Sequence, residues 1–96
     1  MAALMVSQVK VLNAEKFQQY LAQSKDVAAR YGAELAIRSR FSEALLRETS
    51  PHDLLIIARF PDTNAVHGWY NDPAYKDIVA LREEASTQTL SIYEEL

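Results

Sequence analysis

The stretch FPDTNAVHGWYNDPAY, residues 60–75, decides the fold because a strand ends there and two helical segments begin. It follows the most apolar run of the chain, Leu54–Ala58, which predicts a strand buried on both faces. Asp62 is a favourable N-cap for a helix that runs through residues 69–70. The pair Asp72–Pro73 then begins another helix, because proline suits the first helical position.

Upstream of this stretch, the sequence predicts a strand, a helix and a second strand. Residues 4–12 alternate between a mainly apolar and a mixed face, which is typical of a strand. The helix is predicted from the N-cap Asn13 to Gly32, whose position suits a left-handed C-cap. Residues 33–48 predict a long strand, kinked near Ser42. One face of that strand is predicted to carry Leu35, Ile37, Ser39 and Phe41, and the other Ala36, Arg38 and Arg40.

Downstream, the polar segment 48–53 predicts a hairpin connection to the strand 54–60. After the central stretch, the helix that begins at Pro73 is predicted to bury an inward stripe, and residues 87–93 return to strand alternation. The stripe consists of Tyr75, Ile78, Val79, Arg82 and Ala85. The order is β-α-β-β-α-β, so we expect one α+β domain, residues 1–96, of the ferredoxin-like type: a four-stranded antiparallel sheet with the helices on one face.

The other face of this sheet has no helix to cover it. Because the strand at residues 54–60 is apolar on both sides, a monomer would expose a sizeable hydrophobic patch. A second copy packed sheet against sheet would cover the patch. The pattern therefore predicts a homodimer, which for this topology is a dimeric α+β barrel.

Composition limits the other partners. The net charge of −3 argues against nucleic acid as a ligand. With no cysteine and two histidines fifteen positions apart, the sequence predicts no metal site. Its start has no basic signal-peptide region, and no apolar run is long enough to span a bilayer. We therefore expect a cytoplasmic protein that does not enter the membrane.

Several short motifs also resemble a known family. They are Tyr31–Gly32, Phe60–Asp62, Trp69–Tyr70, Asp72–Tyr75 and Leu81–Arg82, together with the pattern of the first strand. In these motifs the chain resembles, over nearly its whole length, the family of domain of unknown function 1330 in the dimeric α+β barrel superfamily. The sequence departs from the family pattern at Ala33 and Ser39, where glycine is usual. The resemblance implies the fold and a homodimer, and it supplies no established reaction.

The wider superfamily contains cofactor-free monooxygenases, haem-degrading enzymes, lactone isomerases and chlorite-degrading haem proteins. The haem-degrading members pair an asparagine of the first strand and a helical tryptophan with a histidine further along the second helical region. This chain resembles them only through Gln8 and Trp69, because its nearest histidine, His67, precedes the tryptophan. We therefore expect neither haem nor another cofactor.

Five side chains are candidates for a ligand site between the sheet and the helices: Tyr20, Arg38, Trp69, Tyr75 and Arg82. The aromatic residues are most simply explained as core packing, although buried hydroxyl groups need hydrogen-bond partners. Arg82 falls on the inward stripe, where a guanidinium needs either a carboxylate partner or an anionic ligand. No catalytic residue is assigned. His67 is a weak candidate for a general base, and a partly exposed structural histidine is the favoured explanation of its position.

Three functions remain open. The first is a small homodimer that binds a small organic ligand, anionic or carbonyl-bearing, between sheet and helices. The second is a cofactor-independent monooxygenase or isomerase, and the third is a structural dimer module without catalysis. A cavity with converging polar groups favours the first two, and a fully packed interior favours the third.

Overall fold

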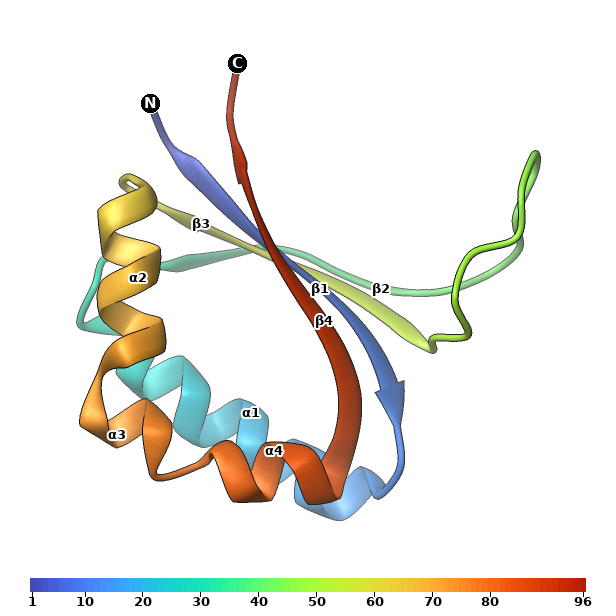
Figure 1. Ribbon diagram of the computed structural model, residues 1–96, viewed down its shortest axis with the longest axis horizontal. Coiled ribbons are helices and arrows are strands. Elements are labelled where there is room, and N and C mark those ends of the chain that lie inside the picture. Colours follow the sequence, from blue (N-terminus) through green and yellow to red (C-terminus); the bar gives the residue numbers. More distant parts are fainter.

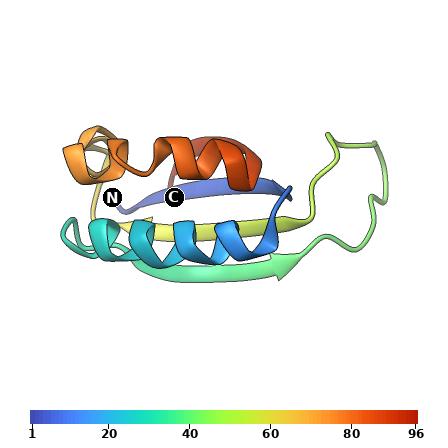
Figure 2. The ribbon, with the colours of Figure 1, turned by 90° about the horizontal axis from the view of Figure 1, so that it is seen from below.

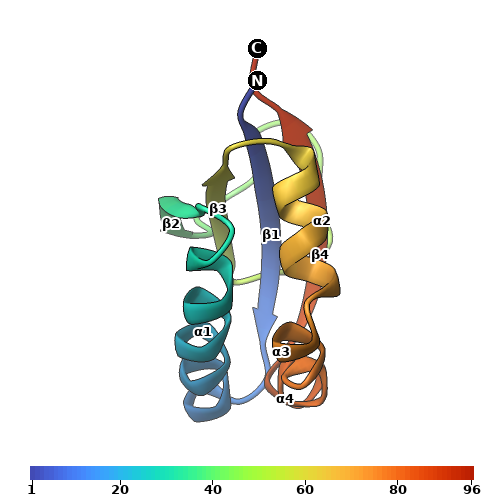
Figure 3. The same ribbon diagram turned by 90° about the vertical axis from the view of Figure 1, so that its left-hand side faces the viewer.

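The computed structural model describes residues 1–96, and its four strands form one antiparallel sheet with the order β2-β3-β1-β4 (Figure 1). The elements are β1 (Ala3–Val11), α1 (Ala14–Ala29), β2 (Glu34–Arg40), β3 (Leu54–Phe60), α2 (Thr63–Asn71), α3 (Pro73–Lys76), α4 (Val79–Ala85) and β4 (Ser86–Glu94). All helices lie on the same face of the sheet, with α1 beside the α2–α4 segment (Figure 3). The predicted ferredoxin-like α+β fold is confirmed.

The predicted helix ends are also present. The Asn13 side chain accepts a hydrogen bond from the Lys16 backbone N–H at 3.0 Å, which caps α1. Asp62 caps α2 by accepting from Ala65 N–H at 2.8 Å. Gly32 has a φ of 77°, the left-handed conformation predicted for the end of the first helix.

Strand register separates a helix-facing side of the sheet from an open side. In β1, Ser7 pairs with Ile56 and lies on the helix-facing side, as Val9 does two residues later. Both β1 side chains are buried. The intervening residue Gln8 pairs with Leu55, and these two lie on the open side.

The predicted faces of the second strand are wrong at Leu35, whereas Ile37 with Ser39 and Arg38 with Arg40 share faces as predicted. Leu35 pairs with Ala58, but Ile37 pairs with Ile57, because the register shifts between these two β2 residues. This bulge inserts one extra residue, Ala36, and so turns the side chains after it to the other face. Leu35 therefore lies on the helix-facing side and Ile37 on the open side.

The second strand is also shorter than predicted, since it ends at Arg40 rather than residue 48. Arg40 pairs with Leu54, the first residue of β3, so no strand remains to pair with the residues that follow. We call residues 41–53 the arm, which projects beyond the sheet (Figure 2). At its outer part, Leu45 and Leu46 are 96% and 82% exposed.

The second helical region is divided, whereas the sequence predicts one continuous helix after Pro73. α3 ends at Lys76, and α4 begins after Ile78, whose φ of −105° and ψ of 4° are not helical. The inward stripe survives this break, because Tyr75, Ile78 and Ala85 are all buried.

The open side of the sheet is uncovered in the single chain. The molecule measures 35 × 34 × 16 Å, and its shortest dimension corresponds to one helical layer on one sheet. Leu55 and Ile57 of β3 are only half-buried there. Ile37 and Tyr93 are 48% and 58% exposed on the same side. None of the helices has both the length and the apolar character needed to cross a membrane.

One polar contact ties the end of α1 to the junction of α2 and α3. The Tyr31 hydroxyl donates to one Asp72 carboxylate oxygen, while the other accepts from Ala74 N–H at 2.7 Å. The Tyr31 ring also lies against Gly68, where an added Cβ would come within 2.7 Å of the ring. Donation by Tyr31, and secondarily by Ala74 N–H, lowers the pKa of Asp72 below its ordinary value of 3.8.

This contact predicts a contribution to acid sensitivity. Because the pKa of Asp72 is lower in the folded state, its stabilisation is present above pH 3.8 and lost as pH falls through the folded-state value. Tyr31→Phe removes the donor, so we expect it to lose less thermal stability than the native protein between about pH 6 and about pH 2. Thermal unfolding followed by circular dichroism measures this difference. Tyr93→Phe, at an exposed tyrosine, is the control, and equal acid losses in all three proteins would contradict the prediction.

Candidate functional site

A cavity of about 280 Å³ lies between helix α1 and the helix-facing side of the sheet. Of its 20 lining residues, 14 are hydrophobic, so its walls are mainly apolar. They include Val9, Phe17, Leu21, Ile56, Phe60 and Leu90. A concave apolar space with a few polar groups is the usual form of a site for a small organic molecule.

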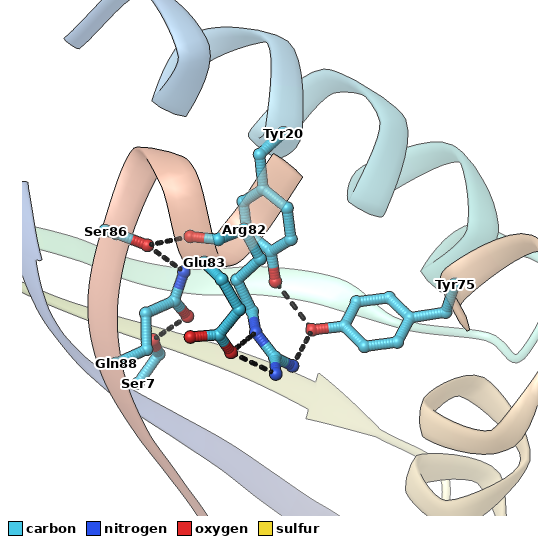
Figure 4. A network of polar contacts seen from close by, with 7 residues as sticks. All are labelled: Ser7, Tyr20, Tyr75, Arg82, Glu83, Ser86 and Gln88. Carbon is cyan, nitrogen blue, oxygen red and sulfur yellow. Dashed lines mark hydrogen bonds and ion pairs between the residues drawn. The ribbon is translucent and has the colours of Figure 1, made fainter. Parts of the chain in front are cut away.

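One series of hydrogen bonds links the neighbouring strands β1 and β4 to the end of α4 at the cavity wall (Figure 4). The Ser7 hydroxyl donates to Gln88 Oε1 at 3.0 Å, and both residues line the cavity. Gln88 Nε2 donates to the Ser86 hydroxyl oxygen at 2.9 Å, and that hydroxyl donates to the Arg82 carbonyl at 3.1 Å. The Ser7 proton is therefore directed at Gln88, which leaves the oxygen lone pairs of Ser7 available as acceptors.

A second series of hydrogen bonds runs from the cavity to the protein surface through two tyrosines (Figure 4). The hydroxyl oxygens of Tyr20 and Tyr75 lie 2.8 Å apart. Arg82 Nη1 donates to the Tyr75 hydroxyl oxygen at 3.0 Å, while its Nη2 donates to Glu83 at 2.8 Å. Of these four residues, Tyr20 alone lines the cavity. Arg82 is thus linked to the cavity through two hydroxyl groups.

Two groups in this series of hydrogen bonds, Tyr20 and Arg82, have pKa values that their surroundings shift. Burial, then the neighbouring Tyr75, raises the pKa of Tyr20 far above its ordinary range, so its hydroxyl stays protonated. The neighbouring Ser24 acts in the opposite direction and lowers the pKa of Tyr20, but its effect is smaller than that of burial. Burial lowers the pKa of Arg82, but its hydrogen bonds to Glu83 and Tyr75 outweigh that effect and raise it. Arg82 is therefore a permanent cation.

Trp69 forms part of the cavity wall and of the aromatic core behind it. Its side chain is 2% exposed, and its ring lies 5.9 Å from Phe60 and 4.4 Å from Tyr75 between centroids. The indole Nε1–H is buried and has no hydrogen-bond acceptor in the protein. A buried donor without a partner is costly, which makes it a candidate contact for a bound molecule.

The structure places the predicted site residues in three positions. Tyr20, Arg38 and Trp69 line the cavity, with Arg38 at its exposed edge. Tyr75 and Arg82 lie behind the wall, where Arg82 forms the ion pair with Glu83 that its inward position required. His67 is exposed on α2, and only its backbone carbonyl forms a hydrogen bond, accepted from Asn71. The aromatic and arginine cluster thus comes together without the histidine.

Two cavity residues, Ser7 and Gln88, were missed by sequence reasoning. The signal for Ser7 was present, because it alternates with Met5 and Val9 on the strand face that is otherwise apolar. A serine at such a position must find a hydrogen-bond partner. Gln88 shares its strand face with Leu90, but the partnership between Gln88 and Ser7 spans 81 residues, which no local pattern reveals.

The Ser50–Asp53 segment uses its side chains to hold the arm. His52 Nδ1 is 2.8 Å from the Ser50 carbonyl oxygen, and the Asp53 carboxylate accepts from Val11 N–H at 2.7 Å. These groups serve the loop backbone, in agreement with the predicted connection between the strands. No group of three or more histidine, aspartate or glutamate side chains is placed to hold a metal ion.

Comparisons with known proteins agree with this architecture. The model of the family described as "Domain of unknown function (DUF1330)" matches residues 2–96. No match was found among curated proteins.

Among solved structures, the chain is similar to RPA0582, a protein of unknown function from Rhodopseudomonas palustris, with 23% identity and a TM-score of 0.85 over 99% of this chain and 82% of that one. It is also similar to SnoaB, a cofactor-independent oxygenase from Streptomyces nogalater, with 18% identity and a TM-score of 0.70 over 99% and 93% of the two chains. A dimeric ferredoxin-like protein of unknown function from Jannaschia sp. CCS1 shares 8% identity, with a TM-score of 0.72 over 99% and 100%. At these identities the structural likeness concerns the fold.

Proposed function

This chain belongs to the family of domain of unknown function DUF1330, and from that premise we propose that it binds a small organic molecule as a homodimer. The ligand occupies the cavity between α1 and the sheet and bears a carboxylate or carbonyl group. The observation that carries this proposal is the cavity itself, of about 280 Å³, in a core that otherwise packs large aromatic side chains.

The chemistry of the cavity wall supports an organic ligand with one polar end. Most of the wall is apolar, so an apolar body gains free energy by leaving water. The polar groups of the inner wall are the Tyr20 hydroxyl, the unpartnered Trp69 N–H, the Ser7 and Gln88 pair and Ser24, while the exposed Lys25, Glu34 and Arg38 carry two positive charges and one negative charge at its edge. With arginine at the edge and hydrogen-bond donors inside, an oxygen acceptor on the ligand is favoured over a cationic group.

The proposed partner on the open side of the sheet is a second copy of this chain. Leu55, Ile57 and Ile37 form an apolar face there, and the arm presents Leu45 and Leu46 beyond the sheet edge. A second sheet packed on this face covers it, and the projecting arm is long enough to reach over a neighbouring chain. The dimeric ferredoxin-like protein from Jannaschia sp. CCS1 is similar over its whole length, which supports this assembly.

A cavity-filling substitution tests the ligand proposal. Ala28 is half-buried on α1 and lines the cavity, so Ala28→Phe fills the space that the ligand needs. Small carboxylic acids and ketones are expected to raise the melting temperature of the native protein, since ligand at a hundredfold excess over Kd stabilises by about 2.7 kcal/mol. Ala28→Phe is expected to lose this gain.

Ala22→Phe provides the matched control, because Ala22 is an exposed residue of the same helix outside the cavity wall. Overpacking alone costs about 1–3 kcal/mol, so the comparison uses the change caused by ligand rather than the starting melting temperature. Stabilisation that persists in Ala28→Phe would place the ligand elsewhere. No stabilisation of the native protein across the screen would favour a structural dimer module.

The second candidate function is oxygenation of an organic molecule without a cofactor. It is favoured by the similarity to SnoaB, a cofactor-independent oxygenase, over 99% of this chain. Oxygen consumption with a stabilising ligand from the screen, measured with an oxygen electrode, separates an enzyme from a binding protein. His67→Gln tests the exposed histidine in that assay, because it removes the imidazole that the sequence suggested as a general base.

A further inference from the structure

We propose that Tyr20 is the polar anchor of the cavity, where its hydroxyl donates a hydrogen bond to a carbonyl or carboxylate oxygen of the ligand. Tyr75 and Arg82 are positioning residues that orient and polarise this hydroxyl from behind the wall. The inference rests on the proposed ligand-binding function and adds the ligand's polar group and the residue that recognises it.

The direction of the hydrogen bonds begins at Arg82. A guanidinium has only donors, so the 3.0 Å contact from Arg82 Nη1 places a hydrogen bond on the Tyr75 oxygen. The Arg82 side chain is 13% exposed and is also held by Glu83, which fixes the guanidinium against the tyrosine. A hydroxyl that accepts from a cation becomes a stronger donor through its own proton.

The Tyr75 proton then points to Tyr20. Tyr75 is 0% exposed, and the Tyr20 oxygen at 2.8 Å is the acceptor available to its hydroxyl. In the reverse arrangement, Tyr75 would accept from both Arg82 and Tyr20, and its own proton would be buried without a partner. Donation from Tyr75 to Tyr20 avoids that cost. With its oxygen accepting from Tyr75, the Tyr20 hydroxyl keeps its own proton to donate, and Tyr20 is the member of this chain of contacts that lines the cavity.

A second donor in the same wall points to the same ligand chemistry. The Trp69 indole N–H is buried without an acceptor, and Trp69 also lines the cavity. Two donors in an apolar space favour a ligand oxygen with lone pairs, such as a ketone, aldehyde or carboxylate. An ammonium group cannot accept a hydrogen bond from either of these donors, which disfavours it at this part of the wall.

The test compares two probes of nearly equal shape. Acetophenone carries a carbonyl oxygen, and ethylbenzene has a methylene in its place, so their difference reports the polar anchor. By titration calorimetry, we expect the native protein to prefer acetophenone. Tyr20→Phe is expected to lower its affinity for acetophenone about 3- to 10-fold, the value of one neutral hydrogen bond, and to leave ethylbenzene unchanged. Tyr93→Phe, at an exposed tyrosine outside the cavity, should bind both probes as the native protein does.

The positioning role has its own readout. In protein with ¹³Cζ-labelled tyrosine, acetophenone should shift the Tyr20 signal and ethylbenzene should not. Tyr75→Phe and Arg82→Met keep the Tyr20 hydroxyl, so they should reduce the preference for acetophenone by less than Tyr20→Phe does.

Both probes binding equally to the native protein would overturn the anchor and leave the cavity function intact. If neither acetophenone nor ethylbenzene bound to the native protein, the cavity function and the anchor would be overturned together.

Discussion

Replacing Trp69 with alanine is expected to destabilise the protein by about 3–5 kcal/mol, the usual cost of truncating a fully buried large aromatic residue. The side chain is 2% exposed and contacts Phe60, Tyr70 and Tyr75. Its removal would enlarge the existing cavity beside it, and the surrounding helix and sheet cannot collapse fully into the space. Chemical denaturation followed by circular dichroism, at one fixed protein concentration, measures the loss.

Tyr70 provides the comparison for this substitution. It is the next residue of α2, but it is 41% exposed, so Tyr70→Ala removes far less buried surface. We expect a clearly smaller loss for Tyr70→Ala than for Trp69→Ala. A loss below about 1 kcal/mol for Trp69→Ala would mean that this ring supports the cavity rather than the fold.

Placing a charge at Ile57 is expected to abolish the proposed dimer. Ile57 lies on the open side of the central strand β3, so Ile57→Asp would bury an unpaired carboxylate between two sheets. Sedimentation velocity at micromolar concentration should show a dimer for the native protein, and a monomer or aggregate for the variant. Ala22→Asp, at an exposed position of α1, should remain dimeric. A stable, folded native monomer at this concentration would contradict the proposed assembly.

The sequence predicted the fold well because its signals are local. Asn13, Asp62 and Gly32 each act on neighbouring backbone groups, and the structure confirms all three. The apolar strand at residues 54–60 likewise needed no distant partner to be recognised. Helix caps and strand alternation depend on residues a few positions apart, so one sequence contains them.

The errors concern features that depend on distant pairing. The bulge at Ala36 exists only in relation to β3, and alternation alone cannot show an unpaired residue. The second strand ends at Arg40 because its partner begins at Leu54, so the residues that follow, which the sequence analysis included in the strand, have no partner to pair with. The break at Ile78 lets α4 pack beside α1, a tertiary demand that outweighs helix propensity.

The candidate site was predicted in composition more than in arrangement. Tyr20, Trp69 and Arg38 lie on the cavity wall, whereas the cation of Arg82 lies behind it. An inward stripe in the sequence predicts which side of a helix faces the core. It does not predict how far a long side chain extends toward the cavity. The link through Tyr75 joins residues 55 positions apart, which explains why the sequence indicated Arg82 itself as the ligand contact.

Alternation along β3 has a consequence for protein redesign. Ile56 and Ala58 line the cavity, while the alternate residues Leu55 and Ile57 face the opposite side of the sheet. One strand of the sheet thus supplies interleaved positions to two separate surfaces. A combinatorial library at residues 56 and 58 could alter ligand preference while the alternate positions remain untouched. Four adjacent residues therefore provide two independent sets of design variables.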